Sequence, residues 1–496
     1  MEHKIGFNSK LYMEKQSKSI LERIEKFGGK LYLEFGGKLF DDLHAARVLP
    51  GFDANAKIKL LQKLKDTAEL ILCISAGDIA RNKIRADYGI TYGSEILRLI
   101  DNISALGILI NSVVITQFEE QHAAITFKNK LEQLKVKVYI HRKTKGYPND
   151  IDTIVSDEGY GQNPYIETTR PLVVVNAPGP GSGKLATCLS QIFHENKRGI
   201  RAGYAKFETF PIWNLPLKHP VNCAYEAATA DIKDSNMIDH FHMQAYSRMT
   251  VNYNRDIEVF PVVRAIMERI SGLTLEYKSP TDMGVNMAGY CITDDEACRE
   301  AAKQEIIRRY YKSLCDVKTG VGSTETVGRL ELIMSELGIR PQERRVIAPA
   351  LQKEKDTGAP AVCIELPSGQ LVTGRRNDIL TAPASAVLNA VKLIAGIDDK
   401  IKLLSINILT PIMEYKTKAL GERDFHLSLD EVLIALSVSA ATDPLAKAAY
   451  DALPALKCGE AHSTCILSKS DEEILRKLNL NVTSEARYAT SDLFNE

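Results

Sequence analysis

Six short apolar runs alternate with helical patterns in the first 210 residues, and this alternation constrains the fold more than any other feature. The runs are rich in β-branched and aromatic residues and lie at Lys30–Leu33, Glu69–Ser75, Ser112–Thr116, Val136–Ile140, Leu172–Asn176 and Gly203–Phe207. Apolar residues recur at helical spacing in the segments between them, at Ala56–Asp66, Gly93–Leu106 and Glu119–Leu134. Continuous apolar strands that alternate with helices predict an α/β fold with a doubly wound, mostly parallel sheet.

The remainder of the chain divides into a looser segment and a second α/β region. Prolines and asparagines interrupt residues 208–320, and the glycine-rich stretch Thr319–Thr324 predicts a domain boundary. Beyond it, Val362–Leu366 and Leu371–Thr373 form a predicted hairpin, and helical patterns follow. We therefore predict a larger domain over residues 1–320 and a smaller C-terminal α/β domain over residues 321–496.

One predicted strand runs into a glycine-rich loop with a lysine at the start of the next helix. The segment reads Val173-Val-Val-Asn-Ala-Pro-Gly-Pro-Gly-Ser-Gly-Lys184, so its candidate ligand-binding residues are Gly179, Gly181, Ser182, Gly183 and Lys184. Glycines let backbone N–H groups point inward, the helix N-terminus is electropositive, and the lysine adds a positive charge. This P-loop-like strand–loop–helix segment predicts a phosphate site, with ATP or a similar nucleotide as the expected cofactor.

The match to the nucleoside-triphosphate pattern GxxxxGK[ST] is incomplete. Pro178 replaces the first glycine, and Leu185 replaces the Ser or Thr that binds Mg²⁺; the next hydroxyl belongs to Thr187. Pro180 also removes one N–H group from the loop. The sequence thus favours phosphate binding over Mg²⁺-dependent phosphoryl transfer. Glycines that serve only tight packing of a strand-to-helix turn are the structural alternative.

A Rossmann-like dinucleotide site is the competing use of the same loop. It requires GxGxxG and an acid about 20 residues further on to bind a ribose. Here the last glycine comes one residue early, and Glu208 follows the Gly203–Phe207 run about 25 residues after Gly183. The dinucleotide interpretation ranks below the triphosphate-type interpretation, and Glu208 is a candidate ligand-binding carboxylate.

Two further loops follow predicted strands. Gly36, Gly37 and Lys38 follow the first strand and repeat the chemistry of small residues plus a lysine, while Asp78 follows the second strand. Each resembles an ordinary turn by itself. Because ligands of parallel sheets bind beyond the carboxyl ends of the strands, we expect these loops to converge with Gly179–Lys184 on one sheet edge.

His240 and His242 form an H-x-H pair that suits a metal ion, although such pairs are more often solvated or packed. His194 and Glu195 begin an HExxH pattern, but the second histidine is absent. His462 is expected to be a buried, hydrogen-bonded side chain. A metal site at His240 and His242 therefore remains an alternative.

Composition and charge exclude several classes of protein. The 63 Lys and Arg residues balance 63 Asp and Glu residues, which argues against nucleic-acid binding through bulk charge. No run approaches the roughly 18 apolar residues of a membrane helix, and Met1–Gln16 does not have the pattern of a secretory signal. Nine scattered cysteines without CxxC indicate reduced thiols. We predict a cytoplasmic protein with a phosphorylated small molecule as its partner; a homo-oligomer suits the length, but no feature specifies one.

Several segments together resemble a bacterial family, the domain of unknown function 1846. They are Glu34-Phe-Gly-Gly-Lys38, Ala177-Pro-Gly-Pro-Gly-Ser-Gly-Lys184, Phe207-Glu-Thr-Phe-Pro-Ile-Trp-Asn214, Val251-Asn-Tyr-Asn-Arg255 and Glu460-Ala-His-Ser-Thr464. The resemblance covers essentially the whole chain and implies little about activity. Some members carry the label of an ATP-dependent zinc protease, from which this sequence departs because it lacks HExxH and the Mg²⁺-binding hydroxyl of the loop.

Three hypotheses about function follow. The leading one is a protein that binds a nucleotide or another phosphorylated small molecule through a degenerate P-loop, as an enzyme acting on it. The second is a nucleotide-responsive binding protein without catalysis, which Leu185 and the lack of an evident acid-ended strand favour. The third is a metal-dependent hydrolase that uses His240 and His242.

Overall fold

The computed structural model describes residues 4–85 and 89–490, and the chain divides into two compact units. The larger unit comprises Ile5–Thr229 and Lys233–Ala302, and the smaller unit comprises Met1–Lys4, Ala230–Ile232 and Lys303–Glu496. The last passage of the chain from the larger to the smaller unit lies within α13 (Asp295–Lys318), and the glycine-rich stretch 319–324 leads from α13 into α14 (Thr324–Leu337).

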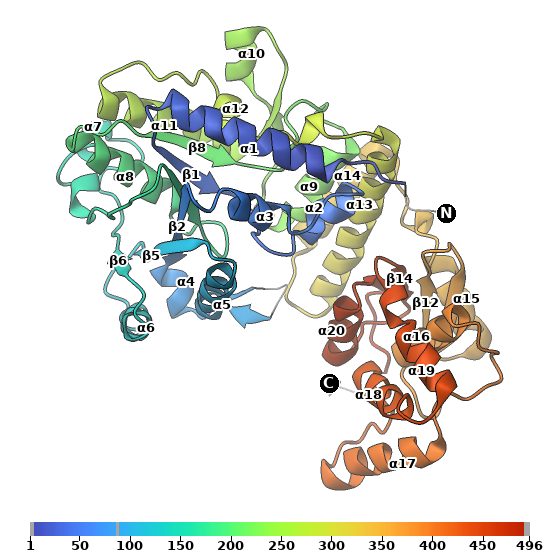
Figure 1. Cartoon of the computed structure of the whole chain (residues 1–496). Helices are drawn as coiled ribbons and strands as arrows, with labels where there is room; N and C mark the ends of the chain where they lie inside the picture. The colour runs from blue at the N-terminus through green and yellow to red at the C-terminus, as the bar shows by residue number, and fades with distance from the viewer. Residues whose placement is uncertain (1–3, 86–88, 491–496) are drawn as a thin grey trace. The chain divides into compact units, whose positions relative to one another are not determined.

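A seven-stranded sheet forms the centre of the larger unit (Figure 1). In spatial order its strands are β11 (Gly284–Val285), β8 (Gly203–Phe207), β1 (Leu31–Phe35), β7 (Leu172–Asn176), β2 (Ala68–Ser75), β5 (Leu109–Thr116) and β6 (Val138–Ile140). Every neighbouring pair is parallel. The predicted parallel α/β sheet is therefore confirmed, and all six predicted strands belong to it.

Helices cover both faces of this sheet. The register pairs Glu34 of β1 with Lys206 of β8, so these side chains point to the same face. The helix α8 (Lys184–Lys197) packs on that face across β7, β1 and β8. On the opposite face, Phe35 and Phe207 stack with ring centroids 4.0 Å apart beneath α3 (Ala56–Lys63). Because α1 (Ser9–Lys26) packs on α3, it lies on that side as well (Figure 1).

The other elements of the larger unit are short hairpins and helices. The hairpins pair β3 (Ile84–Arg85) with β4 (Ile90–Thr91) and β9 (Asn236–Ile238) with β10 (Val251–Tyr253). The helices are α2 (Leu43–Val48), α4 (Ala76–Ala80), α5 (Tyr92–Ala105), α6 (His122–Gln133), α7 (Ile151–Ile154), η1 (Tyr160–Gln162), α9 (Pro220–Ala228), α10 (His240–Tyr246), α11 (Asn254–Ser271), α12 (Pro280–Met283) and η3 (Ala288–Tyr290).

The smaller unit has a mixed four-stranded sheet in the order β13 (Leu371–Arg375), β12 (Ala361–Glu365), β14 (Glu460–Ser463) and β15 (Asn481–Ser484). The antiparallel pair β12 and β13 confirms the predicted hairpin, and β15 pairs with β14 in parallel. Its helices are η2 (Ala230–Ile232), α14, η4 (Pro341–Glu343), α15 (Ile347–Thr357), α16 (Ala382–Ile394), α17 (Ile406–Glu414), the π-helix η5 (Tyr415–Ala419), α18 (Leu429–Ser439), α19 (Pro444–Asp451), η6 (Leu453–Leu456) and α20 (Lys469–Lys477).

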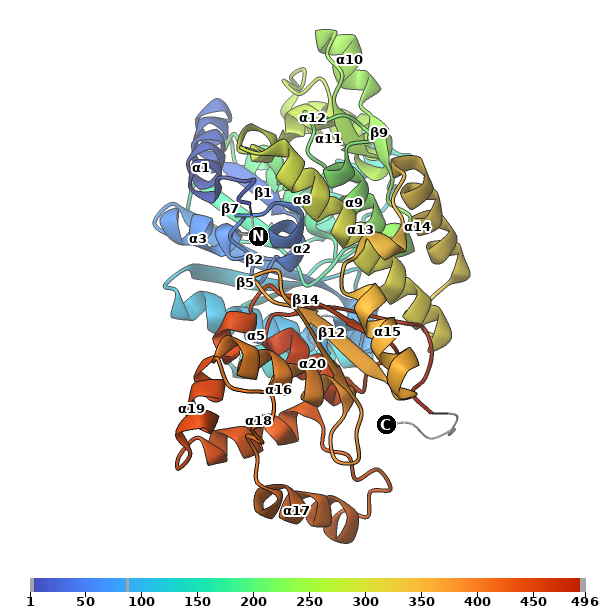
Figure 2. The ribbon, with the colours of Figure 1, turned by 90° about the vertical axis from the view of Figure 1, so that its right-hand side faces the viewer.

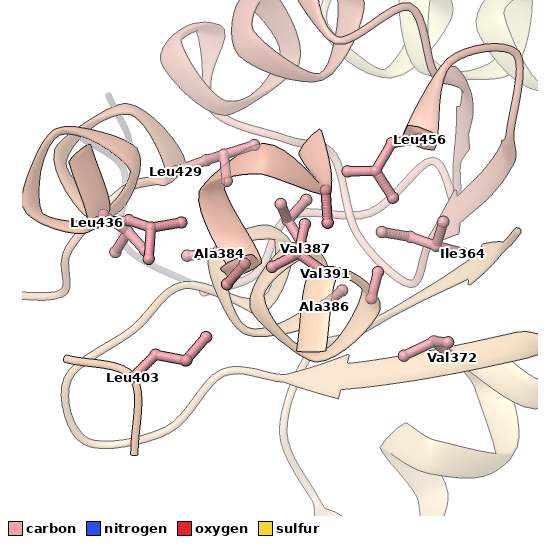
Figure 3. Close-up of a cluster of buried hydrophobic side chains, with 14 of the residues drawn as sticks. Ile364, Val372, Ala384, Ala386, Val387, Val391, Leu403, Leu429, Leu436 and Leu456 are labelled. Atoms are coloured by element: carbon pink, nitrogen blue, oxygen red, sulfur yellow. The ribbon is translucent and has the colours of Figure 1, made fainter. Parts of the chain in front are cut away.

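The core of the smaller unit surrounds α16, which packs on β12 and β13 and against α18 and α19 (Figure 2). Val387 and Val391 of α16 lie in the middle of this cluster, between Ile364 of β12 and Leu429 and Leu436 of α18 (Figure 3). These five side chains are buried. The smaller unit therefore has a hydrophobic core of its own, which is consistent with an independent domain.

In the parts of the chain that the structure describes, no helix has both the length and the apolar composition needed to cross a lipid bilayer. This agrees with the absence of a long apolar run in the sequence.

Candidate phosphate-binding site

The segment between β7 and α8, residues 177–183, is called the glycine loop below. Gly181 and Gly183 have φ of +71° and +78°, a region where a side chain is strained. A Cβ on Gly179 would lie 2.2 Å from the Tyr92 hydroxyl oxygen, and a Cβ on Gly183 would lie 2.9 Å from Thr116. Close packing thus accounts for Gly179 and Gly183. It does not account for Gly181, where a Cβ would meet nothing within 4 Å.

Side chains bind the carbonyl oxygens of the glycine loop from the protein side. Four such hydrogen bonds are present: Ser182 Oγ to Gly179 O at 2.8 Å, Gln117 Nε2 to Gly181 O at 3.2 Å, Thr116 Oγ1 to Ser182 O at 2.8 Å, and Thr187 Oγ1 to Gly183 O at 3.0 Å. In a trans peptide the N–H group points away from the carbonyl of the same unit. The N–H groups of Gly183 and Lys184 therefore point away from Thr116 and Thr187.

The backbone N–H groups of residues 183–186 make no hydrogen bond with any described part of the chain. Gly183 is the N-cap of α8 and, lacking a side chain, provides no acceptor of its own. These N–H groups carry the positive end of the helix dipole. The arrangement has the donors and the polarity that an anion requires.

Lys184 faces Glu34, a carboxylate from the neighbouring strand β1. Its Nζ lies 3.8 Å from Glu34 Oε1, and the two side chains are only 13% and 12% exposed. The other carboxylate oxygen, Oε2, accepts a 2.8 Å hydrogen bond from the buried Tyr204 hydroxyl. Burial and the Glu34 charge raise the pKa of Tyr204 well above its ordinary value, so Tyr204 remains a neutral donor.

Glu208 belongs to a second group of charges, at the end of β8. The ammonium of Lys206 lies 2.9 Å from Glu208 and 2.6 Å from Asp256, the third residue of α11. The Tyr253 hydroxyl donates to Glu208 at 3.0 Å, and its ring lies beneath the Lys206 ammonium at 4.2 Å. Because β1 separates β7 from β8, Glu208 lies two strands away from the glycine loop.

The environment of Glu208 favours its protonated form. Burial raises the pKa of Glu208 to about 8; Lys206 lowers it, and the neighbouring Asp256 carboxylate raises it. For Lys206, burial lowers the pKa, but Asp256 and Glu208 raise it by more, so the lysine stays charged. Burial thus favours the protonated form of Glu208 near neutral pH.

The structure brings the other predicted loop residues to the same edge of the sheet, since β1 and β2 flank β7 and run parallel to it. The N–H of Gly36 donates to Phe207 O of β8 at 3.1 Å, Gly37 has a φ of +70°, and Lys38 is half-buried beyond them. Asp78 is buried and pairs with Arg81 and Lys83, so its charge is already compensated.

The structure separates the two histidines of the H-x-H pair. His240 is exposed and lies against the Phe241 ring, whereas His242 is buried and its Nδ1 is 2.9 Å from Ser279 Oγ. Residues two apart on a helix point to different sides. Among residues 4–85 and 89–490, no group of three or more His, Cys, Asp or Glu side chains is arranged to bind a metal ion.

His462 of the smaller unit is buried, and its Nδ1 lies 2.9 Å from Thr483 Oγ1. The prediction of a buried, hydrogen-bonded histidine is therefore confirmed. Burial lowers the pKa of His462, although Glu485 raises it.

Glu34 and Thr116 contact Lys184 and the glycine loop, and the motifs alone do not reveal them. No acid-ended strand was expected beside the glycine loop, yet β1 is a buried strand that ends in Glu34 and Phe35 and lies directly beside β7. The sequence signal for this residue is an acid near the end of the apolar run Leu31–Phe35. Thr116 ends β5, two strands from β7, and only the order of the strands brings it to Ser182.

Comparison with known proteins gives matches over nearly the whole chain. "Domain of unknown function DUF1846, N-terminal" matches residues 5–338, and "Domain of unknown function DUF1846, C-terminal" matches residues 342–494. UPF0371 proteins from the Alaska E43, Eklund 17B and Langeland strains of Clostridium botulinum are each 56% identical over 499 residues, which cover 99% of both chains. These descriptions name a family and no ligand or reaction.

Proposed function

The chain belongs to the bacterial family of the domain of unknown function 1846, and from the geometry of its glycine loop we propose that it binds the phosphate group of a nucleotide or of another phosphorylated small molecule. The observation that carries this proposal is the set of four consecutive N–H groups, residues 183–186, without an acceptor at the start of α8. Phosphate oxygens would accept from these groups, and Lys184 would add a positive charge.

Catalysis on the bound molecule is the fuller form of this proposal. Glu34 and Glu208 are carboxylates on the same face as Lys184, and the pKa of Glu208 is raised to about 8. A carboxyl group with such a pKa can accept or donate a proton at neutral pH. The enzyme hypothesis therefore names Glu208 as the group that exchanges a proton with the ligand.

Binding without turnover is the second candidate, and it is favoured by the lack of an Mg²⁺-binding hydroxyl. Leu185 occupies the position of that hydroxyl, and Thr187 directs its own toward Gly183 O. Ser182 likewise donates to Gly179 O inside the loop. Binding of a nucleotide without turnover, with Mg²⁺ supplied, would select this candidate over the enzyme.

Calorimetric titration tests the proposal. ATP, GTP, NAD, sugar phosphates and inorganic phosphate are titrated into the wild type, Lys184→Ala and Lys197→Ala. We expect at least one ligand to bind, with an affinity roughly tenfold or more lower in Lys184→Ala. Lys197 ends the same helix and is 48% exposed, so Lys197→Ala should bind as the wild type does. If none of these compounds binds the wild type, the proposal is wrong.

A further inference from the structure

Lys184 and Glu34 face each other without a hydrogen bond. Their 3.8 Å separation is too long for one, and within the described residues neither Lys184 Nζ nor Glu34 Oε1 has another hydrogen-bond partner. The Lys184 and Glu34 side chains keep 13% and 12% of their surface exposed, so a ligand can reach the gap between them. A group that accepts from the ammonium and donates to the carboxylate would satisfy both, and a hydroxyl does both.

The charges around this gap disfavour a polyphosphate. The positive charges of Lys184 and Lys206 are already balanced by the acidic groups that they face, those of Glu34, Glu208 and Asp256. A triphosphate would add several negative charges to this group, and its usual counter-ion is an Mg²⁺ held by a loop hydroxyl. Leu185 replaces that hydroxyl, and Thr187 donates its own to Gly183 O. A single phosphate can be accommodated by the free N–H groups and Lys184 alone.

The spacing of the strands indicates the length of the ligand. Neighbouring strands lie roughly 4.8 Å apart, so the end of β8 is displaced from the end of β7 by roughly 10 Å. A molecule with its phosphate at the glycine loop would pass Glu34 of β1 and reach toward Glu208. Carboxylates accept hydrogen bonds from hydroxyl groups, so both acids suit a chain of hydroxyl-bearing carbons.

We infer that the ligand of the glycine loop is a monophosphorylated compound with several hydroxyl groups, a sugar or polyol phosphate, and that one of its hydroxyls bridges Lys184 and Glu34. This inference rests on the proposed function and narrows its ligand class. Glu34 is then the residue that distinguishes such a ligand from inorganic phosphate and from a nucleoside triphosphate.

Calorimetry with matched ligands tests the inference. Glycerol 3-phosphate, ribose 5-phosphate, glucose 6-phosphate, inorganic phosphate, and ATP with Mg²⁺ are titrated into the wild type, Glu34→Gln and Glu34→Asp. In the wild type, at least one of the three organic monophosphates should bind roughly tenfold or more tightly than inorganic phosphate and ATP. Because a neutral amide accepts more weakly than a carboxylate, Glu34→Gln should lose most of that advantage while it binds inorganic phosphate no less tightly.

Two controls separate folding and ligand class from each other. Glu34→Asp keeps the charge, so it should fold as the wild type does. Because its side chain is shorter, it should lose part of the tighter binding of organic monophosphates. Glu158→Gln changes an exposed acid and should leave all affinities unchanged. The inference would be wrong if all the phosphates bound with equal affinity or if ATP bound most tightly. It would also be wrong if both Glu34 variants kept the wild-type preference for organic monophosphates. Each of these results would leave the phosphate site itself in place. Only a lack of binding by every phosphate would overturn both.

Discussion

Lys184 at the start of α8 and Glu34 at the end of β1 form an ion pair of 3.8 Å that links two neighbouring strands of the parallel sheet. The two residues are 150 positions apart in the sequence. Their side chains are largely buried, so water screens the pair less than it screens the exposed ion pairs of this chain. We therefore expect the pair to affect the stability of the folded chain.

A double-mutant cycle measures that contribution. Lys184→Met leaves the Glu34 charge with Tyr204 alone, and Glu34→Gln leaves the lysine without its counter-charge. Each single change should lower the free energy of unfolding by about 1–3 kcal/mol, and the double variant should lose less than the sum of the two. Urea denaturation of the four proteins gives the coupling energy, which we expect to be about 1–2 kcal/mol. A coupling near zero would mean that the two charges do not stabilise each other.

Alanine substitutions at two glycines of the loop compare the cost of backbone strain alone with the cost of strain plus a steric contact. Gly181→Ala places a side chain at a φ of +71° in open space. It should lower the free energy of unfolding by about 1–2 kcal/mol. Gly183→Ala has the same conformational cost, and its Cβ would also lie 2.9 Å from Thr116, so a total of about 2–4 kcal/mol is expected. Parallel urea denaturation curves give both values. Equal losses would show that the contact with Thr116 has no energetic importance.

The strands of the larger unit were predictable because they are buried on both faces. β1, β2 and β7 are buried at every position, so each is largely apolar, and their few polar residues lie near the strand ends. The helix α1 was not predicted, because its buried side includes the polar Gln16, whose amide donates to Val285 O of β11. A tertiary hydrogen bond of this kind leaves no periodic signal in the sequence.

The glycine loop was predictable from local spacing, but its partners were not. Lys184 and the loop glycines follow one strand directly, whereas Glu34 reaches them only because β1 inserts between β7 and β8. The order of strands in a sheet depends on crossover connections, which composition and periodicity do not encode. Asp256 likewise reaches Glu208 by tertiary packing, from α11, whereas Lys206 is only two residues from Glu208 in the sequence.

In the smaller unit, Arg344 and Arg345 are adjacent residues with opposite environments. Arg344 is 1% exposed, pairs with Glu460, and donates to Thr483 Oγ1 at 3.0 Å. Arg344→Leu leaves the Glu460 carboxylate and several acceptors without this donor. It should lower the free energy of unfolding by about 3–5 kcal/mol. Arg345 is 49% exposed and pairs with Glu365 at the surface, so Arg345→Leu should change stability by at most about 1 kcal/mol. Thermal and urea unfolding followed by far-UV circular dichroism compares the two; similar losses would contradict the burial of Arg344.

Glu208 makes stability depend on pH in a defined direction. Its pKa is raised to about 8 in the folded protein, chiefly by burial, against an ordinary value of 4.5. Between pH 4.5 and about pH 8 the folded chain keeps a proton on Glu208 that the unfolded chain has lost. The contribution of Glu208 to the free energy of unfolding is therefore largest below pH 4.5 and falls as the pH rises to about 8. Because glutamine does not titrate, Glu208→Gln should not show this fall in stability with rising pH.

Comparison of the two proteins at each pH cancels the contributions of the groups that do not interact with Glu208. From about pH 5 to about pH 8, Glu208→Gln should gain on the wild type by about 2 kcal/mol or more in urea denaturation, since a tenfold difference in proton affinity between the folded and unfolded chain corresponds to about 1.4 kcal/mol. Glu158→Gln should follow the wild type throughout, because Lys145 lowers the pKa of Glu158 and that acid titrates below this range. A difference between Glu208→Gln and the wild type that stays constant over the range would show that Glu208 is already ionised at its acidic end. The Lys206 ammonium would then outweigh burial, and Glu208 would be a fixed charge instead of the proton-exchanging group of the proposed function.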